Sequence, residues 1–98
     1  MNKYDSIKKK YTDISIAVAN YYAISIDEMY KLNREDCVNA RYCAIYIMCD
    51  RYTDYDISKV CSLSKNGVNK IRNKFRDKLS NLSFNEDYQN ILMIVDKN

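Results

Sequence analysis

The chain has 98 residues, of which 47% are hydrophobic and 30% charged, and its net charge is +3. This balance is typical of one soluble globular domain and argues against a disordered or membrane-embedded chain. Proline is absent and Gly67 is the one glycine, so the residues that β-hairpin turns need are almost missing. We therefore expect a single domain over residues 1–98 with an all-α fold, a compact bundle of about six helices.

The first two helices are predicted from apolar spacing and from a capping signal. Between Tyr4 and Tyr22, apolar residues recur every three or four positions, which is the period of a helix that packs along one face. Ser25 followed by Glu28 has the spacing of a capping box, in which each side chain binds the other residue's backbone N–H. This pair predicts a short second helix over Ser25–Lys31.

A long central helix and a short one are predicted next. Apolar residues and one arginine at helical spacing favour a long helix in the middle of the bundle. These positions are Val38, Arg41, Ile45, Met48 and Tyr52. Thr53 with Asp56 is a second capping signal and predicts a helix of about two turns over Asp56–Cys61.

Two more helices follow, each with one apolar face. From Lys65 onward the apolar residues again step by three or four positions, at Val68, Ile71, Phe75 and Leu79. Ser83 with Glu86 has capping-box spacing and predicts the start of the last helix. The side chains expected to close the core from this helix are Tyr88, Ile91, Leu92 and Val95. Most of the ten tyrosines are expected at the edges of the core and not on a base-stacking surface.

Residues 57–68 have the spacing of a helix-turn-helix, and we expect the whole motif at about residues 56–79. In this arrangement Leu63 fills the turn, Ser64 caps the second helix and Val68 docks that helix on the first. The first turns of the second helix then point outward, where side chains can enter the major groove of DNA. The predicted DNA-binding residues of this segment are Ser64, Lys65, Asn66, Gly67, Asn69, Lys70, Asn73 and Lys74.

The charge and polarity of this second helix suit a DNA partner. Residues 65–78 contain six basic residues and a single acid. Lysine can donate to guanine, and asparagine can form a paired hydrogen bond with adenine. Glycine inside a helix costs about 1 kcal/mol relative to alanine, so Gly67 suggests a close approach to DNA or to the preceding helix, or else a merely tolerated glycine. The alternative for the whole segment is an ordinary helical hairpin with a solvated basic face.

Three stretches resemble a known family: residues 16–25 (IAVANYYAIS), residues 27–29 (DEM) and residues 34–47 (REDCVNARYCAIYI). Together they are similar to the C-terminal DNA-binding domain, domain IV, of the bacterial replication initiator DnaA. That family has a Trp-repressor-like helix-turn-helix fold. Its pattern implies that Arg34 enters the minor groove and that Arg41 helps to hold the DNA backbone.

The chain departs from the family pattern in two places. Spacing counted from Arg41 puts the minor-groove arginine at Asn33, so the assignment of Arg34 requires a shift of one residue. The family reads its binding box with an Asp-His-Thr-Thr-Val signature, whereas residues 64–68 of this chain are SKNGV and keep only the valine. We therefore expect the same fold with a different DNA sequence preference.

The sequence predicts a sequence-specific binder of double-stranded DNA, either a small transcriptional regulator or a replication-origin binder from a phage or other mobile element. One helix-turn-helix buries little area on DNA, so a homodimer or a further protein partner is also expected. The alternative function is a protein-interaction adaptor or inhibitor that keeps the DnaA-like fold but no longer reads DNA. The missing signature motivates this alternative.

Other function classes are disfavoured by what the sequence lacks. It has no histidine and no two-residue cysteine spacing, which argues against a metal site. It has no nucleophile elbow or phosphate loop, so we expect neither an enzyme nor a cofactor. A leader and an apolar run of about 18 residues are also missing, so we expect a cytoplasmic protein with reduced thiols and no membrane contact.

Overall fold

The computed structural model describes residues 2–97, which form six helices and no strand. The helices are α1 (Lys3–Tyr21), α2 (Ile26–Lys31), α3 (Glu35–Cys49), α4 (Asp54–Ser58), α5 (Lys65–Lys78) and α6 (Leu82–Lys97). The prediction of an all-α bundle of about six helices is confirmed, while the extreme residues 1 and 98 of the predicted domain lie outside the described range. Within that range, no helix has both the length and the hydropathy of a membrane-spanning segment.

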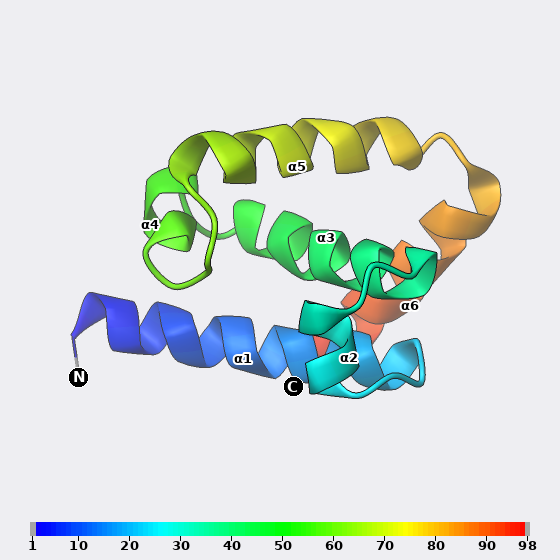
Figure 1. The fold of residues 1–98 in the computed structure, drawn as a ribbon, viewed down its shortest axis with the longest axis horizontal. Coiled ribbons are helices and arrows are strands. Elements are labelled where there is room, and N and C mark those ends of the chain that lie inside the picture. Colours follow the sequence, from blue (N-terminus) through cyan, green and yellow to red (C-terminus); the bar gives the residue numbers. More distant parts are fainter. Residues whose placement is uncertain (1, 98) are drawn as a thin grey trace.

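Three long helices are stacked in layers, with α3 between α1 and α5 (Figure 1). The chain direction alternates from layer to layer, so α3 runs antiparallel to both neighbours. The short helix α2 packs on α1 and α3 near one end of the stack, and α4 packs on α5 and α3 near the other. Because α3 has neighbours on opposite sides, it buries residues around most of its circumference.

An aromatic cluster joins α3, α5 and α6. Phe75 on α5 is fully buried and stacks on Tyr46 of α3, with ring centroids 4.6 Å apart. Tyr88 and Phe84 of α6 meet the same ring edge to face, at 5.4 and 4.8 Å. Edge-to-face and offset pairs add about 0.5–1.5 kcal/mol each beyond the area they bury. Tyr88 is buried and six other tyrosines are half-buried against the core, so the prediction that most tyrosines line core edges is confirmed.

The end of α1 is formed by an alanine in a left-handed conformation. Ala23 has φ 56°, which L residues other than glycine rarely adopt. The N–H of Ile24 binds the carbonyl of Ala19 at 3.0 Å, and the N–H of Ala23 binds that of Asn20 at 3.1 Å. These two bonds define a Schellman motif, the usual end of a helix at glycine. The chain therefore stops α1 without a glycine and carries the strain of a left-handed Cβ.

The predicted capping box at the start of α2 is confirmed. The N–H of Glu28 donates to Oγ of Ser25 at 3.0 Å, and the N–H of Ser25 donates to the Glu28 carboxylate at 3.1 Å. The predicted second box at Ser83 is wrong. The N–H of Phe84 binds Oδ1 of Asn81 at 3.0 Å, so Asn81 caps α6 and Ser83 lies within its first turn. Asparagine is at least as good a cap as serine, and this register also places Phe84 on the aromatic cluster.

The predicted bounds of two helices also need correction. The helix expected over Asp56–Cys61 is α4, which begins and ends earlier because Thr53 caps it by accepting the N–H of Asp56 at 3.2 Å. After Ser58 the chain tightens into a turn. The long helix ends at Cys49, since the next two N–H groups bond to carbonyls three residues back, and Tyr52 lies beyond its end.

Candidate nucleic-acid interface

The helix-turn-helix of this chain consists of α4, the turn of residues 59–64 and α5. Ile57 on α4 and Val68 on α5 are fully buried, and Leu63 in the turn is half-buried against the same core. Oγ of Ser64 accepts the N–H of Gly67 at 3.1 Å and caps α5. The predicted cap, turn residue and docking valine are confirmed, and together they fix where α5 begins and how it lies on α4.

One face of α5 packs and the opposite face is open. The helix buries Val68, Ile71 and Phe75, and it forms one of the two outer layers of the stack (Figure 1). On the opposite face of the helix, the exposed side chains include most of the predicted DNA-binding residues. They are Lys65, Asn66, Lys70, Asn73, Lys74 and Arg76. We call these six residues the outer face of α5.

Asn69 lies at the edge of that face and is held by α4. Its Nδ2 donates to Oδ2 of Asp54 at 3.2 Å, and NH1 of Arg72 binds the other carboxylate oxygen at 3.1 Å. The Asp54 side chain is 10% exposed, so this carboxylate sits in a shielded position between the two helices. Sequence reasoning missed Asp54, whose role depends on how α4 crosses α5. The amide oxygen of Asn69 also accepts from Nδ2 of Asn73 at 3.3 Å, so both ends of this side chain are engaged within the chain.

Two lysines extend the positive charge of α5 toward α3. The Lys74 ammonium lies 5.6 Å from the ring centroid of Tyr42, and Lys78 donates to Oδ1 of Asn39 at 2.8 Å. Tyr42 and Asn39 both belong to α3, so the basic surface crosses the boundary between the two helices.

Gly67 faces the other way: a Cβ built on it would lie 3.4 Å from Cβ of Leu63 and from Oγ of Ser64. It approaches its own turn and not the solvent.

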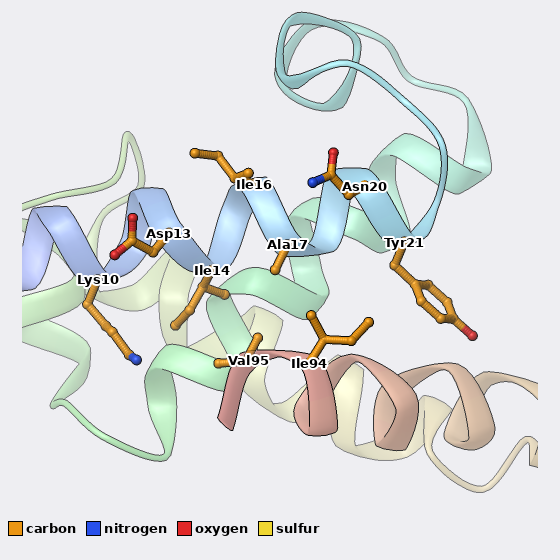
Figure 2. Close-up of a pocket in the computed structure, with 9 residues that line it drawn as sticks. All are labelled: Lys10, Asp13, Ile14, Ile16, Ala17, Asn20, Tyr21, Ile94 and Val95. Atoms are coloured by element: carbon orange, nitrogen blue, oxygen red, sulfur yellow. The ribbon is translucent and has the colours of Figure 1, made fainter. Parts of the chain in front are cut away.

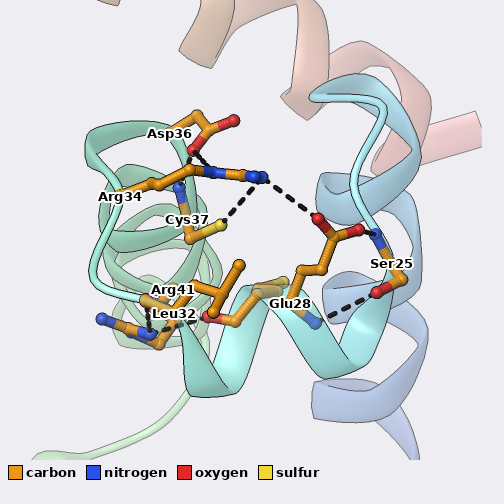
Figure 3. Close-up of polar contacts among 8 residues, drawn as sticks. Ser25, Glu28, Leu32, Arg34, Asp36, Cys37 and Arg41 are labelled. Carbon is orange, nitrogen blue, oxygen red and sulfur yellow. Dashed lines mark hydrogen bonds and ion pairs between the residues drawn. The ribbon is translucent and has the colours of Figure 1, made fainter.

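Arg34 is placed outside the helix-turn-helix, at the N-terminal end of α3 (Figure 3). Its NH2 lies 3.2 Å from a carboxylate oxygen of Glu28, and its Nε lies 3.2 Å from Oδ1 of Asp36. The pKa of Glu28 lies below its usual value, chiefly because the carboxylate accepts the Ser25 N–H and also because it faces Arg34. The positive charge of Arg34 is thus matched by two local acids.

Arg41 connects α3 to the end of α2 (Figure 3). Its NH1 donates to the carbonyl oxygens of Met29 and Leu32, both at 2.8 Å. These are among the last carbonyls of α2, which have no partner within their own helix. Arg41 therefore has a structural task in addition to the DNA-backbone contact that the family resemblance implies.

A second surface feature is an apolar groove between α1 and α6 (Figure 2). It has a volume of about 470 Å³, and two of its isoleucines are strongly exposed, Ile16 at 45% and Ile94 at 41%. Lys10 and Asp13 also line it. In Figure 1, α1 and α5 are the two outer layers, so this groove and the outer face of α5 lie on different sides of α3.

The structure gathers the predicted residues from Ser64 to Lys74 on one helix, and it places Arg34 and Arg41 near α2 instead. Within residues 2–97, no three side chains of the metal-ligating types converge. No family model matches the chain, and no curated protein or solved structure is similar enough to give a match.

Proposed function

We propose that the chain binds double-stranded DNA in a sequence-specific way, with the outer face of α5 in the major groove. The observation that carries this proposal is the construction of α5: a capped helix of 14 residues that packs through one face and leaves a basic, amide-rich face open. A recognition helix needs such an exposed face because its side chains must reach base edges in the groove.

The outer face divides by chemistry. Asn66 and Asn73 lie nearly opposite the buried side of α5 and carry the paired donor and acceptor that suit adenine. The Asn73 amide donates to Asn69 at 3.3 Å and accepts from Arg76 at 3.2 Å, so binding a base would replace these two contacts. Lys70 between them suits guanine. Lys65 and Lys74 lie toward the two flanks, where contacts to phosphates would position the helix without reading sequence. The N-terminal end of α5 adds a favourable dipole for an anion.

The biological role that fits this activity is a small transcriptional regulator or a replication-origin binder of a phage or mobile element. The resemblance of residues 16–47 to DnaA domain IV supports the origin-binding role. The different residues at the start of α5 favour a target sequence other than that family's binding box.

The deciding experiment selects binding sites for the purified chain from a randomised duplex library and then measures affinity at two salt concentrations. Lys65→Ala with Lys70→Ala should weaken binding by about tenfold or more and reduce the salt dependence by about one ion equivalent, because Lys65 is the phosphate contact of this pair. The matched control is Lys8→Ala with Lys31→Ala, which removes the same charge from exposed positions on α1 and α2. Equal losses in both variants, or no enriched sequence, would contradict the proposal.

A role as a protein-interaction adaptor is the second candidate, and the groove between α1 and α6 favours it. Exposed apolar side chains that line a groove are a common feature of protein interfaces. Sedimentation of the wild type and of Ile94→Glu tests the homodimer version of this role, because Ile94 faces α1 across the groove (Figure 2). Concentration-dependent association that Ile94→Glu abolishes would support it, whereas a monomer in both cases would reject self-association through this groove.

A further inference from the structure

A pocket of about 460 Å³ lies between the turn of the helix-turn-helix and the helices beneath it. Tyr11 of α1 and Tyr30 of α2 line one side, and Ser62 and Leu63 of the turn line another. Residues of α3 and α5 complete the lining, Tyr42 among them. Five separate segments of the chain thus meet around one hollow next to the start of α5.

The pocket carries a positive charge. Among the described residues that line it, Arg41 alone has a charged side chain. The pKa of Tyr11 is raised by burial, and so is that of Cys61, so neither group supplies a negative charge near neutral pH. NH1 of Arg41 is held by two α2 carbonyls, while the other nitrogens of its guanidinium make no hydrogen bond within residues 2–97. The group is therefore fixed in position and keeps donors for an anion.

The remaining lining suits an aromatic ring. Three tyrosines supply ring faces and edges, and the side chains of Ile45, Leu63 and Ile71 supply aliphatic surface. Small-molecule sites typically combine such a mostly apolar lining with a few fixed polar groups. Arginine binds carboxylates through a planar set of donors, which sets the orientation of a ligand as well as its affinity.

We propose that this pocket binds a small aromatic carboxylate, with its ring among the tyrosines and Leu63 and its carboxylate on the guanidinium of Arg41. The ligand would rest against the turn, and Leu63 lies 3.4 Å from where a Cβ of Gly67 would stand, within the first turn of α5. Occupancy should therefore restrict the start of α5. Any effect on DNA affinity rests on the proposed function, but ligand binding does not.

The test is a titration of the isotope-labelled chain with phenylacetate, followed by backbone amide chemical shifts. We expect saturable shifts at Tyr11, Tyr42 and Ser62, with a dissociation constant of about 1 mM or below for a ligand of this size. Phenylacetamide keeps the ring and loses the charge, and its affinity should be lower than that of phenylacetate by a factor of about ten or more. Ser62→Phe, which adds bulk at an exposed turn position of the lining, should abolish the shifts.

The matched control is Ser83→Phe, the same change at an exposed serine on α6, which should leave the titration as it is in the wild type. Absence of saturable shifts, shifts confined to the outer face of α5, or equal affinity for the amide would overturn the pocket proposal. Site selection with the ligand-free chain tests DNA binding separately, so failure of either idea is recognised without the other.

Discussion

Oδ2 of Asp54 accepts a hydrogen bond from Nδ2 of Asn69 at 3.2 Å, so the first residue of α4 fixes a side chain in the predicted DNA-binding helix. The same carboxylate pairs with Arg72 at 3.1 Å. Asp54→Ala removes both contacts, and we expect the free energy of unfolding to fall by about 1–3 kcal/mol, as for hydrogen bonds to charged groups. Urea denaturation measures this change.

Asp77→Ala is the matched control for that loss. Asp77 is an exposed carboxylate on α5, and its side chain has no ion pair within the described range. Its removal should change stability by about 0.5 kcal/mol or less. If the free energy of unfolding fell by the same amount in both variants, the contacts of Asp54 with Asn69 and Arg72 would not stabilise the chain.

Ala23→Gly should stabilise the chain. The left-handed φ of 56° costs an alanine about 1 kcal/mol, and glycine adopts it without that strain. We expect the free energy of unfolding to rise by roughly this amount in urea denaturation. Ala17→Gly, in the middle of α1, should instead lower it by about 1 kcal/mol or more. A destabilising Ala23→Gly would mean that the end of α1 differs from the Schellman geometry.

Gly67→Ala should also stabilise, by about 0.5–1 kcal/mol, because alanine is the better residue inside a helix. The added methyl group would lie 3.4 Å from Leu63 and Ser64, close to ordinary contact, and would point at the turn. We therefore expect unchanged DNA affinity, measured on the selected site. Lower affinity with normal stability would instead indicate that DNA approaches the backbone at this glycine.

The two candidate caps of α6 can be separated by substitution. Asn81→Ala removes the acceptor for the Phe84 N–H and should lower the free energy of unfolding by about 1 kcal/mol. Ser83→Ala, within the first turn, should leave it nearly unchanged. Thermal or urea unfolding of the two variants decides between the two caps. A larger loss of stability in Ser83→Ala than in Asn81→Ala would support the capping box at Ser83 that was expected from the sequence.

Acid should remove the contribution of the α2 capping box. The pKa of Glu28 is lower in the folded chain than in the unfolded chain. The ionised carboxylate therefore makes its full contribution to the free energy of unfolding above the ordinary pKa of about 4.3, and this contribution is lost as the pH falls through the lowered pKa. Between about pH 7 and about pH 3, wild type should therefore lose more stability than Glu28→Gln, which has no carboxylate to protonate. Denaturation at both pH values measures the difference.

Glu86→Gln provides the control for the acid experiment. Glu86 is exposed, and its carboxylate makes neither a hydrogen bond nor an ion pair within residues 2–97. This variant should follow the wild-type pH dependence. A wild type that parallels Glu28→Gln instead would show that the box contributes nothing through its charge.

The parts of the fold that the sequence predicted correctly are those that depend on neighbours in sequence. The apolar face of α5 and the caps at Ser25, Thr53 and Ser64 involve residues three or four positions apart, and a helix fixes such contacts locally. The start of α6 was predicted at Ser83, but Asn81, an equally competent cap two residues earlier, takes that place. When α6 begins after Asn81, Phe84 packs against Phe75 of α5, and this contact between distant segments cannot be recognised from local sequence.

The surroundings of the candidate site residues could be predicted less completely, because they depend on contacts between segments far apart in the sequence. Side chains on α5 could be identified as outward-facing from the helical period alone. The engagement of Asn69 with Asp54 depends on the crossing of two helices, and that of Arg41 depends on backbone carbonyls of α2. Neither partner leaves a recognisable spacing in the sequence.

The left-handed end of α1 has a consequence for the evolution of this sequence. Its glycine lies inside a helix, at position 67, while an alanine occupies position 23, where glycine is favoured. Exchanging these two residues would leave the amino-acid composition unaltered and should raise the free energy of unfolding by about 1–2 kcal/mol. That margin would let the molecule accept a new, mildly destabilising residue on the outer face of α5 without losing its fold.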